Sequence, residues 1–262
     1  MEKRYLAPSE VAQAIIASSE TKASLSITRM LILGIMAGIY IGLGGYAYIV
    51  VMQTLGNIDA GLMKFFGAFV FPVGLMLVVF SGSELFTGNN LMTMGLMDKK
   101  ITLTGMLKNW IFVYIGNFIG SVILAYIIYK SQLVSKDILA TTLDLGLAKT
   151  SLSFQAAFLR GVLCNILVVL AVWTASASLD IGSRILSVWF PVMLFILSGF
   201  EHCVANMFTL PLARFSGLNI TWSHIWITNL IPVTLGNIVG GGIIIPVAYY
   251  ITYILPAKKD SQ

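Results

Sequence analysis

Charged residues are scarce in this sequence of 262 residues, and their scarcity excludes an ordinary soluble domain. Only 10% of the residues are Asp, Glu, Lys or Arg, whereas soluble domains carry about 25%. Hydrophobic residues make up 58% of the chain, so a soluble protein of this composition would expose a large apolar surface to water. A surface that faces lipid tails has no such limit. We therefore predict an integral membrane protein.

Cysteine and histidine are nearly absent as well. The cysteines, Cys164 and Cys203, both lie in apolar runs and are interpreted as packing residues. The two histidines form no cluster with metal-ligand spacing, so we expect no metal and no other cofactor. Basic blocks interleaved with aromatic residues are missing, which argues against nucleic acid as a partner. The N-terminus lacks the apolar run of a secretory signal, so no cleavable signal is expected.

Uncharged stretches predict the membrane-spanning helices, because one span needs about 20 apolar residues. Four such helices are expected, at 29–53, 108–130, 156–178 and 227–254. Two further stretches, 65–97 and 185–213, are uncharged except for Glu84 and Glu201. Each is too long for one span and too short for two. We therefore predict that each is a helix broken at membrane depth, which gives an all-α fold with six spans and broken second and fifth helices.

Each broken stretch contains polar and glycine residues where the break belongs, at 81–90 and 198–202. Glycine tolerates backbone angles that other residues avoid. Irregular backbone within a membrane persists only where protein or a water-filled cavity satisfies its polar groups. The two breaks should therefore line a cavity or a pore.

The two halves of the sequence repeat one another. Glu84 and Asn89 match Glu201 and Asn206 at an offset of 117 residues. The third and sixth spans match at an offset of 120 residues, through Asn109, Gly116, Asn117 and Gly120 against Asn229, Gly236, Asn237 and Gly240. Because each repeat crosses three times, the second enters from the opposite face and the repeats are inverted. Such proteins place their pathway at the repeat interface.

The expected organisation follows from these spans. It comprises a short interfacial helix within 1–28, a first repeat at 29–130, an outer connecting loop at 131–155, a second repeat at 156–254 and a tail at 255–262. Lysine and arginine favour one side of the membrane by ten to six. This bias predicts that both termini lie in the cytoplasm.

Several motifs of the chain resemble the formate/nitrite transporter family over roughly residues 8–255. They are Glu84-Leu85-Phe86-Thr87-Gly88-Asn89, Lys108-Asn109-Trp110, Gly199-Phe200-Glu201-His202, Val204-Ala205-Asn206-Met207-Phe208 and Asn229-Leu230-Ile231-Pro232-Val233-Thr234 with Gly236-Asn237. The resemblance implies an aquaporin-like protomer, a homopentamer with one pore per protomer, and a place in the cytoplasmic membrane. It also implies small monovalent anions as substrates, namely formate, nitrite or hydrosulfide, and the whole sequence looks most like the hydrosulfide branch.

His202 is the residue that we place at the centre of the pore. It is ionisable at membrane depth, where such residues are usually functional, and the first repeat has Leu85 in its place. The resemblance also carries the family's central pore histidine to this position. A protonated or proton-donating imidazole would lower the cost of removing an anion from water. It would also be able to convert the anion of a weak acid into a neutral molecule.

The resemblance implies roles for further polar residues. Thr87 would donate a hydrogen bond to the anion or to His202, and Lys149 would draw anions towards the pore. Asn165 and Asn229, polar at membrane depth, would bridge these groups. For Lys149 a solvated surface lysine remains the alternative.

Four apolar residues near the breaks match the family's constrictions. Phe71, Leu75 and Phe195 would form an outer narrowing and Phe86 an inner one, with ordinary core packing as the alternative. The symmetric carboxylates, Glu84 and Glu201, are expected to accept hydrogen bonds from backbone amides and to hold the breaks in shape.

Three other functions compete with this interpretation. A proton-coupled formate or nitrite transporter stays open, because His202 would couple flux to protons. A neutral-solute channel of aquaporin type usually carries paired Asn-Pro-Ala loops, which the sequence lacks. An enzyme would need a nucleophile with a base or a metal cluster, and neither pattern is present. We therefore predict a channel and not an enzyme.

Overall fold

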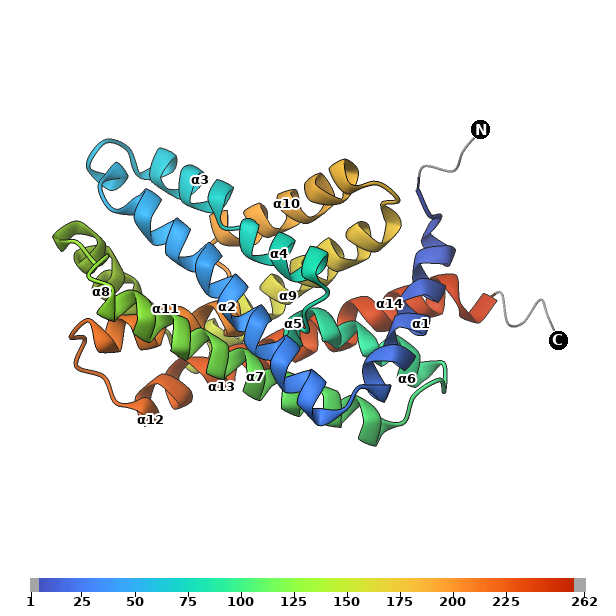
Figure 1. The fold of residues 1–262 in the computed structure, drawn as a ribbon. Coiled ribbons are helices and arrows are strands. Elements are labelled where there is room, and N and C mark those ends of the chain that lie inside the picture. The colour runs from blue at the N-terminus through green and yellow to red at the C-terminus, as the bar shows by residue number, and fades with distance from the viewer. Residues whose placement is uncertain (1–4, 257–262) are drawn as a thin grey trace.

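The computed structural model describes residues 5–256, and its regular elements there are helices (Figure 1). Helix α1 (Pro8–Ser24) lies within the predicted range 1–28, with proline in its first turn and the Ala7 N–H donating to the Glu10 carboxylate at 2.7 Å. Its apolar face is buried against the protein and includes Val11, Ile15 and Ile16. Helix α1 thus packs on the body of the molecule, beside α6 and the end of α14.

Five helical stretches are long and apolar enough to cross a membrane, judged by length and composition. They are Ile27–Asn57, Ala60–Ser81, Leu103–Lys130, Phe154–Ala177 and Trp222–Tyr253. The first contains α2 (Ile27–Met52) and the second contains α3 (Ala60–Val70) and α4 (Val73–Ser81). The third and fourth are α7 (Leu103–Lys130) and α9 (Phe154–Ala177). A sixth apolar helix, α10 (Ile181–Leu197), is shorter.

Both predicted breaks are present. The first follows α4, where Gly82 adopts a left-handed conformation with φ of 69°, and the chain resumes in α5 (Phe86–Asn89) and α6 (Thr93–Met97). The second follows α10, where Gly199 has φ of 70°, and the chain resumes in α11 (Cys203–Phe215). Glycine is required at both positions because a side chain is strained at such angles.

The connection at 131–155 differs from the expected loop, because it contains helix α8 (Lys136–Thr150). Ser135 caps this helix by accepting a hydrogen bond from the Ile138 N–H. Ile138, Thr142 and Gly146 are buried at four-residue spacing, which places them on one helical face against α11. That face is narrow and partly polar, so the sequence alone does not indicate a helix there.

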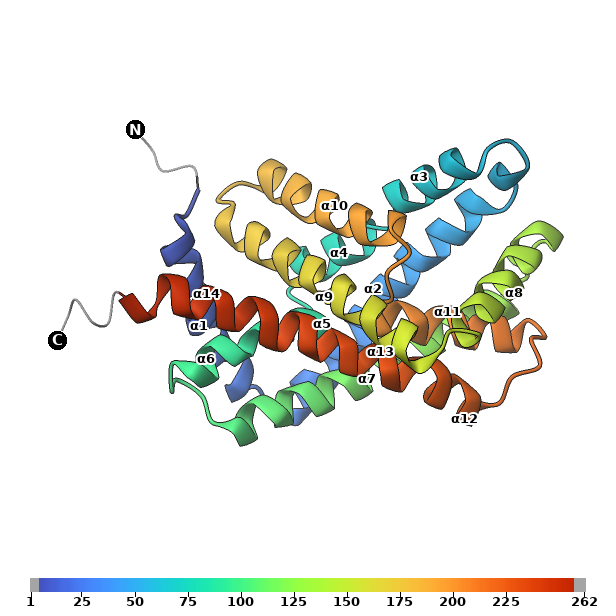
Figure 2. The same ribbon diagram turned by 180° about the vertical axis from the view of Figure 1, so that it is seen from behind.

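The last span is also longer than predicted. It comprises α12 (Trp222–Ile225), α13 (Ile231–Asn237) and α14 (Ile245–Tyr253), joined by π-helical turns at Trp226–Leu230 and Ile238–Ile244. Figure 2 shows it running beside α9. Asn229 lies in the first of these turns, and π-helical turns often accompany functional sites.

Close packing at glycine joins the helices around both breaks. A Cβ atom on Gly120 of α7 would lie 2.0 Å from the Ile35 carbonyl oxygen of α2. A Cβ atom on Gly236 of α13 would lie 2.1 Å from the Phe158 carbonyl oxygen of α9. Only glycine allows these backbones to approach so closely. The helix pairs α2–α7 and α9–α13 therefore form matching supports, one for each break.

Candidate functional site

A buried asparagine holds each break to its supporting helices. Asn117 of α7 donates from Nδ2 to the carbonyl oxygens of Gly34 and Glu84, at 2.8 and 2.9 Å, and its Oδ1 accepts from the Phe86 N–H at 2.9 Å. These three bonds tie the first break to α2 and α7. The backbone of the break therefore keeps a fixed shape although it is not helical.

Asn237 of α13 repeats this arrangement at the second break. Its Nδ2 donates to the carbonyl oxygens of Gly161 and Glu201, at 2.8 and 3.0 Å, and its Oδ1 accepts from the Cys203 N–H at 3.0 Å. Residues that match in the sequence thus make matching bonds. The repeated motifs of the sequence correspond to a repeated hydrogen-bond pattern.

The carboxylate of Glu84 is buried and accepts from three side chains. Lys22 contacts it at 2.5 Å, and the amides of Asn89 and Asn109 at 2.6 and 3.3 Å. The expectation that this carboxylate binds backbone amides is therefore wrong. Lys22 was missed by the sequence reasoning, although it precedes Lys149 by the same 127 residues that separate Gly34 from Gly161.

Glu201 has three equivalent partners in the second half, one lysine and two asparagines. Lys149 contacts its carboxylate at 3.0 and 3.1 Å, and the amides of Asn206 and Asn229 contact it at 2.6 and 3.4 Å. Asn229 also donates to the Lys149 carbonyl oxygen at 3.0 Å. The structure thus brings Lys149, Glu201 and Asn229 into one network.

His202 caps helix α11 and meets the first break through Thr87. Its Nδ1 accepts from the Ala205 N–H at 3.1 Å, and its Nε2 lies 2.8 Å from Thr87 Oγ1. A backbone N–H can only donate, so Nδ1 carries no proton and the neutral ring holds its proton on Nε2. The ring then donates to Thr87. Of the two forms considered from the sequence, a protonated or a proton-donating imidazole, this geometry corresponds to the neutral, proton-donating ring.

The His202 ring lies in a constriction with a volume of about 10 Å³. Phe195 stacks on the ring with centroids 5.8 Å apart, and Phe71 meets Phe195 edge-on at 5.8 Å. The full lining is Ile41, Phe71, Leu75, Leu85, Val168, Val192, Phe195 and His202. Such a space holds about one water molecule. We call it the neck.

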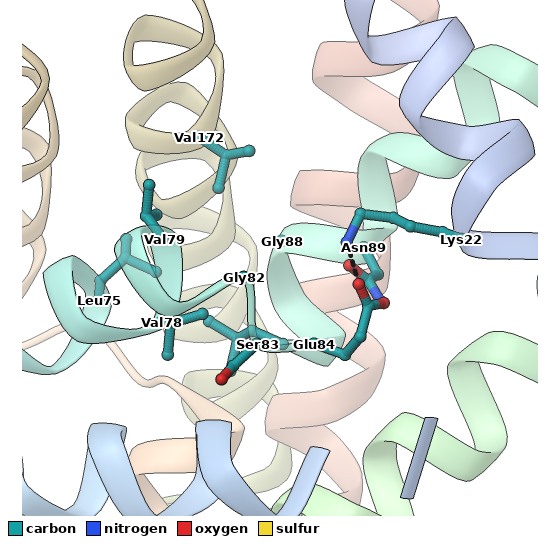
Figure 3. Close-up of a pocket in the computed structure, with 11 residues that line it drawn as sticks. Lys22, Leu75, Val78, Val79, Gly82, Ser83, Glu84, Gly88, Asn89 and Val172 are labelled. Atoms are coloured by element: carbon teal, nitrogen blue, oxygen red, sulfur yellow. Dashed lines mark hydrogen bonds and ion pairs between the residues drawn. The ribbon is translucent and has the colours of Figure 1, made fainter. Parts of the chain in front are cut away.

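A larger cavity adjoins each side of the neck. The Glu84 cavity, of about 180 Å³, shares Leu75 and Leu85 with the neck. The Glu201 cavity, of about 160 Å³, shares Phe71 with it. Figure 3 shows Lys22, Glu84 and Asn89 facing Leu75, Val79 and Val172 across the Glu84 cavity. Each cavity therefore combines an apolar wall with one lysine–glutamate pair.

Two residues lie elsewhere than the sequence interpretation placed them. Phe86 packs against Trp110 and Tyr114, with ring centroids 5.9 and 4.9 Å away, and lines neither the neck nor the two cavities. The side of the neck next to the Glu84 cavity is lined instead by Leu75 and Leu85. The physical reason is that Asn117 holds the Phe86 backbone, which turns this ring away towards α7.

Asn165 is also outside the lining of these spaces. Its Nδ2 lies within hydrogen-bond distance of the Thr87 carbonyl, Asn90 Oδ1 and the Asn237 carbonyl, at 3.3, 2.8 and 2.7 Å. It therefore fastens the first break to α9 and α13. By holding Thr87 from behind, Asn165 helps to position the hydroxyl that meets His202.

Known proteins resemble this chain over nearly its whole length. The sequence profile described as formate/nitrite transporter matches residues 9–251. A probable formate transporter of Methanothermobacter thermautotrophicus is 41% identical, over 97% of this chain and 99% of its own. A formate channel of Bacillus thuringiensis is 37% identical, over 94% of this chain and 95% of its own.

Two solved structures share the fold. A pentameric formate channel with formate bound has a TM-score of 0.78 at 33% identity, and covers 87% of this chain and 98% of its own. An ion channel of the FNT family has a TM-score of 0.83 at 31% identity, and covers 93% of this chain and 98% of its own. Both structures therefore resemble this chain over most of its length.

Proposed function

The chain belongs to the formate/nitrite transporter family, a family of channels and transporters and not of enzymes, and we propose that it conducts small monovalent anions of weak acids. The observation that carries this proposal is the neck, whose otherwise apolar lining is interrupted by His202, which is hydrogen-bonded to the buried Thr87. Formate is the substrate we favour, because the similar proteins are named for it. Nitrite and hydrosulfide, the latter favoured by the sequence alone, are the alternatives.

The neck selects by size and by polarity. Its volume of about 10 Å³ excludes a hydrated ion, and its aromatic and aliphatic walls make a bare charge costly. His202 is the polar group of the lining that meets the substrate, and its hydrogen bond to the buried Thr87 hydroxyl fixes the orientation of the ring.

We further propose that the anion takes a proton from water in the cavity that it enters, leaves hydroxide to diffuse back into the solution on that side, and crosses the neck as the neutral acid. The neutral His202 ring supplies no fixed positive charge in the neck, since its Nδ1 is occupied by the Ala205 N–H. A neutral acid avoids the cost of burying a charge. This mechanism makes the protein a proton-linked path for the anion.

The architecture proposed for this function has six spans in two inverted, aquaporin-like repeats, at 29–130 and 156–254. The matching bonds of Asn117 and Asn237 support the repeat. With both termini in the cytoplasm, the Glu84 cavity opens inwards and the Glu201 cavity outwards. The proposed location is the cytoplasmic membrane, and the proposed assembly is a homopentamer, as named for the solved formate channel.

Transport by the purified protein in liposomes tests the function. Stopped-flow uptake of formate, nitrite, hydrosulfide and glycerol would be compared, with a pH dye trapped inside. We expect uptake of the anions, accompanied by acidification, and no uptake of glycerol. Uptake of glycerol without anions would overturn the proposal in favour of a neutral-solute channel. Anion uptake without acidification would overturn the passage of a neutral acid.

A further inference from the structure

The lysine of the Glu201 cavity is not a free positive charge. Lys149 Nζ lies 3.0 and 3.1 Å from the two carboxylate oxygens of Glu201, and these side chains are only 19% and 6% exposed. Such a pair carries no net charge. The same holds for Lys22 and Glu84 in the other cavity. Neither pair by itself would concentrate anions.

Arg160 adds an unbalanced positive charge to the Glu201 cavity. It lines this cavity, is exposed, and takes part in no ion pair with the residues that the structure describes. Its place is fixed by the break itself, since the Glu201 N–H donates to the Arg160 carbonyl at 3.3 Å. In the first half the Glu84 N–H donates to Leu33 in the same way. The two cavities therefore differ by one cation.

Tyr48 offers a hydrogen-bond donor in the same cavity. It lines the cavity together with Arg160, and its ring meets Phe71 edge-on with centroids 6.5 Å apart. Because Phe71 also lines the neck, Tyr48 lies close to the entrance of the neck. Its hydroxyl makes no hydrogen bond to any residue within 5–256, so it remains available to a ligand in the cavity.

We propose that Arg160 and Tyr48 form a docking site for a monovalent oxyanion in the Glu201 cavity. The guanidinium presents paired donors that match the two oxygens of a carboxylate or of nitrite. Its attraction is stronger in a partly enclosed cavity than in bulk water. The inference rests on the proposed anion transport. It narrows the substrates to oxyanions such as formate and nitrite, because hydrosulfide has no second acceptor atom for the paired guanidinium donors.

The test compares Arg160→Leu, which installs the first-half residue, with Arg160→Lys and Tyr48→Phe. Lys136→Gln is the matched control, because it removes one exposed charge from α8 and lines neither cavity nor the neck. We expect Arg160→Leu to raise the half-saturation concentration for formate and nitrite about tenfold, as the loss of one charge-assisted bond implies. The increase for hydrosulfide should be smaller, and Arg160→Lys and Tyr48→Phe should give intermediate values for the oxyanions. The control should stay within about twofold.

A second measurement separates this site from the proposed function. Formate binding to the detergent-solubilised protein is followed by saturation-transfer NMR, with circular dichroism confirming that each variant is folded. Loss of binding in Arg160→Leu, with retention in Lys136→Gln, supports the site even if the wild type conducts no anion. Equal binding by the wild type and Arg160→Leu would overturn it, whatever the flux.

Discussion

The Nε2 atom of His202 lies 2.8 Å from the Oγ1 atom of Thr87, so the two breaks meet at the neck through one side-chain hydrogen bond. The partner positions are unequal, because His202 corresponds to Leu85 in the first half and Thr87 to Val204 in the second. The two halves therefore share one backbone arrangement, and the polar pair arises at two positions where their sequences differ. The chemistry of His202 and Thr87 can therefore be tested separately from the hydrogen bonds that hold the breaks.

Replacing His202 with phenylalanine should lower formate flux about tenfold or more, since a hydrogen bond of about one to two kcal/mol is lost at the neck. Replacement with asparagine should cost much less, because asparagine caps a helix well and remains polar. Stopped-flow uptake at pH 5 to 8 measures both variants. An unchanged rate and pH dependence in His202→Phe would contradict a role for this ring.

Glu84→Gln and Glu201→Gln should destabilise the protein to similar extents. Each change leaves a lysine without its carboxylate partner, at a cost of about 1–3 kcal/mol. The fraction of protein that survives heating in detergent, followed by size-exclusion chromatography, gives the measurement. Glu20→Gln, at an exposed position of α1, is the control and should behave as the wild type. A large effect at one buried carboxylate only would show that the matching networks are not energetically equivalent.

Asn117→Ala and Asn237→Ala should each be more damaging than the loss of a single hydrogen bond. Either change leaves one carbonyl and one N–H of the break without a partner and removes the second hydrogen bond of a helical glycine carbonyl, at about 1–3 kcal/mol for each unpartnered group. We expect loss of folded protein, seen in urea denaturation followed by tryptophan fluorescence. Asn57→Ala, at an exposed position between α2 and α3, serves as the comparison. Stability close to that of the control would refute the anchoring role.

Two glycines should respond to alanine in opposite ways. Gly120→Ala places a methyl group against the Ile35 backbone, which cannot yield, so little folded protein is expected. At Gly88 the new methyl would meet only the Val172 side chain, at 3.3 Å, within the Glu84 cavity. Gly88→Ala should therefore fold and lower flux by a few-fold, and Val172→Ala in the same chain should restore it. A poorly folded Gly88→Ala would contradict this account.

The breaks could be predicted from the sequence because each uncharged stretch is too long for one span and too short for two, and contains glycine and polar residues where the helix must open. The family resemblance pointed to Lys149, Thr87 and His202, which the structure places beside the breaks. Lys22 was missed because it precedes the first span and lies 62 residues from Glu84, so that only the fold joins them. The direction of the Phe86 ring depends on how the break turns, which no local pattern specifies.

The π-helical turns of the last span are a further feature that the sequence did not predict. Their residues, including Asn229 and Gly240, also suit an ordinary α-helix. In the structure these turns contact distant segments, through Asn229 at Glu201 and Gly240 at Val162, and no local pattern specifies such contacts.

The matched lysine–glutamate pairs have a directional consequence. A pore whose two cavities carried only these neutral pairs should reach half-saturation at the same formate concentration from either side. Arg160 lines one cavity only, so formate supplied from the Glu201 side should saturate the flux at a lower concentration than formate supplied from the Glu84 side. Arg160→Leu should make the two half-saturation concentrations equal.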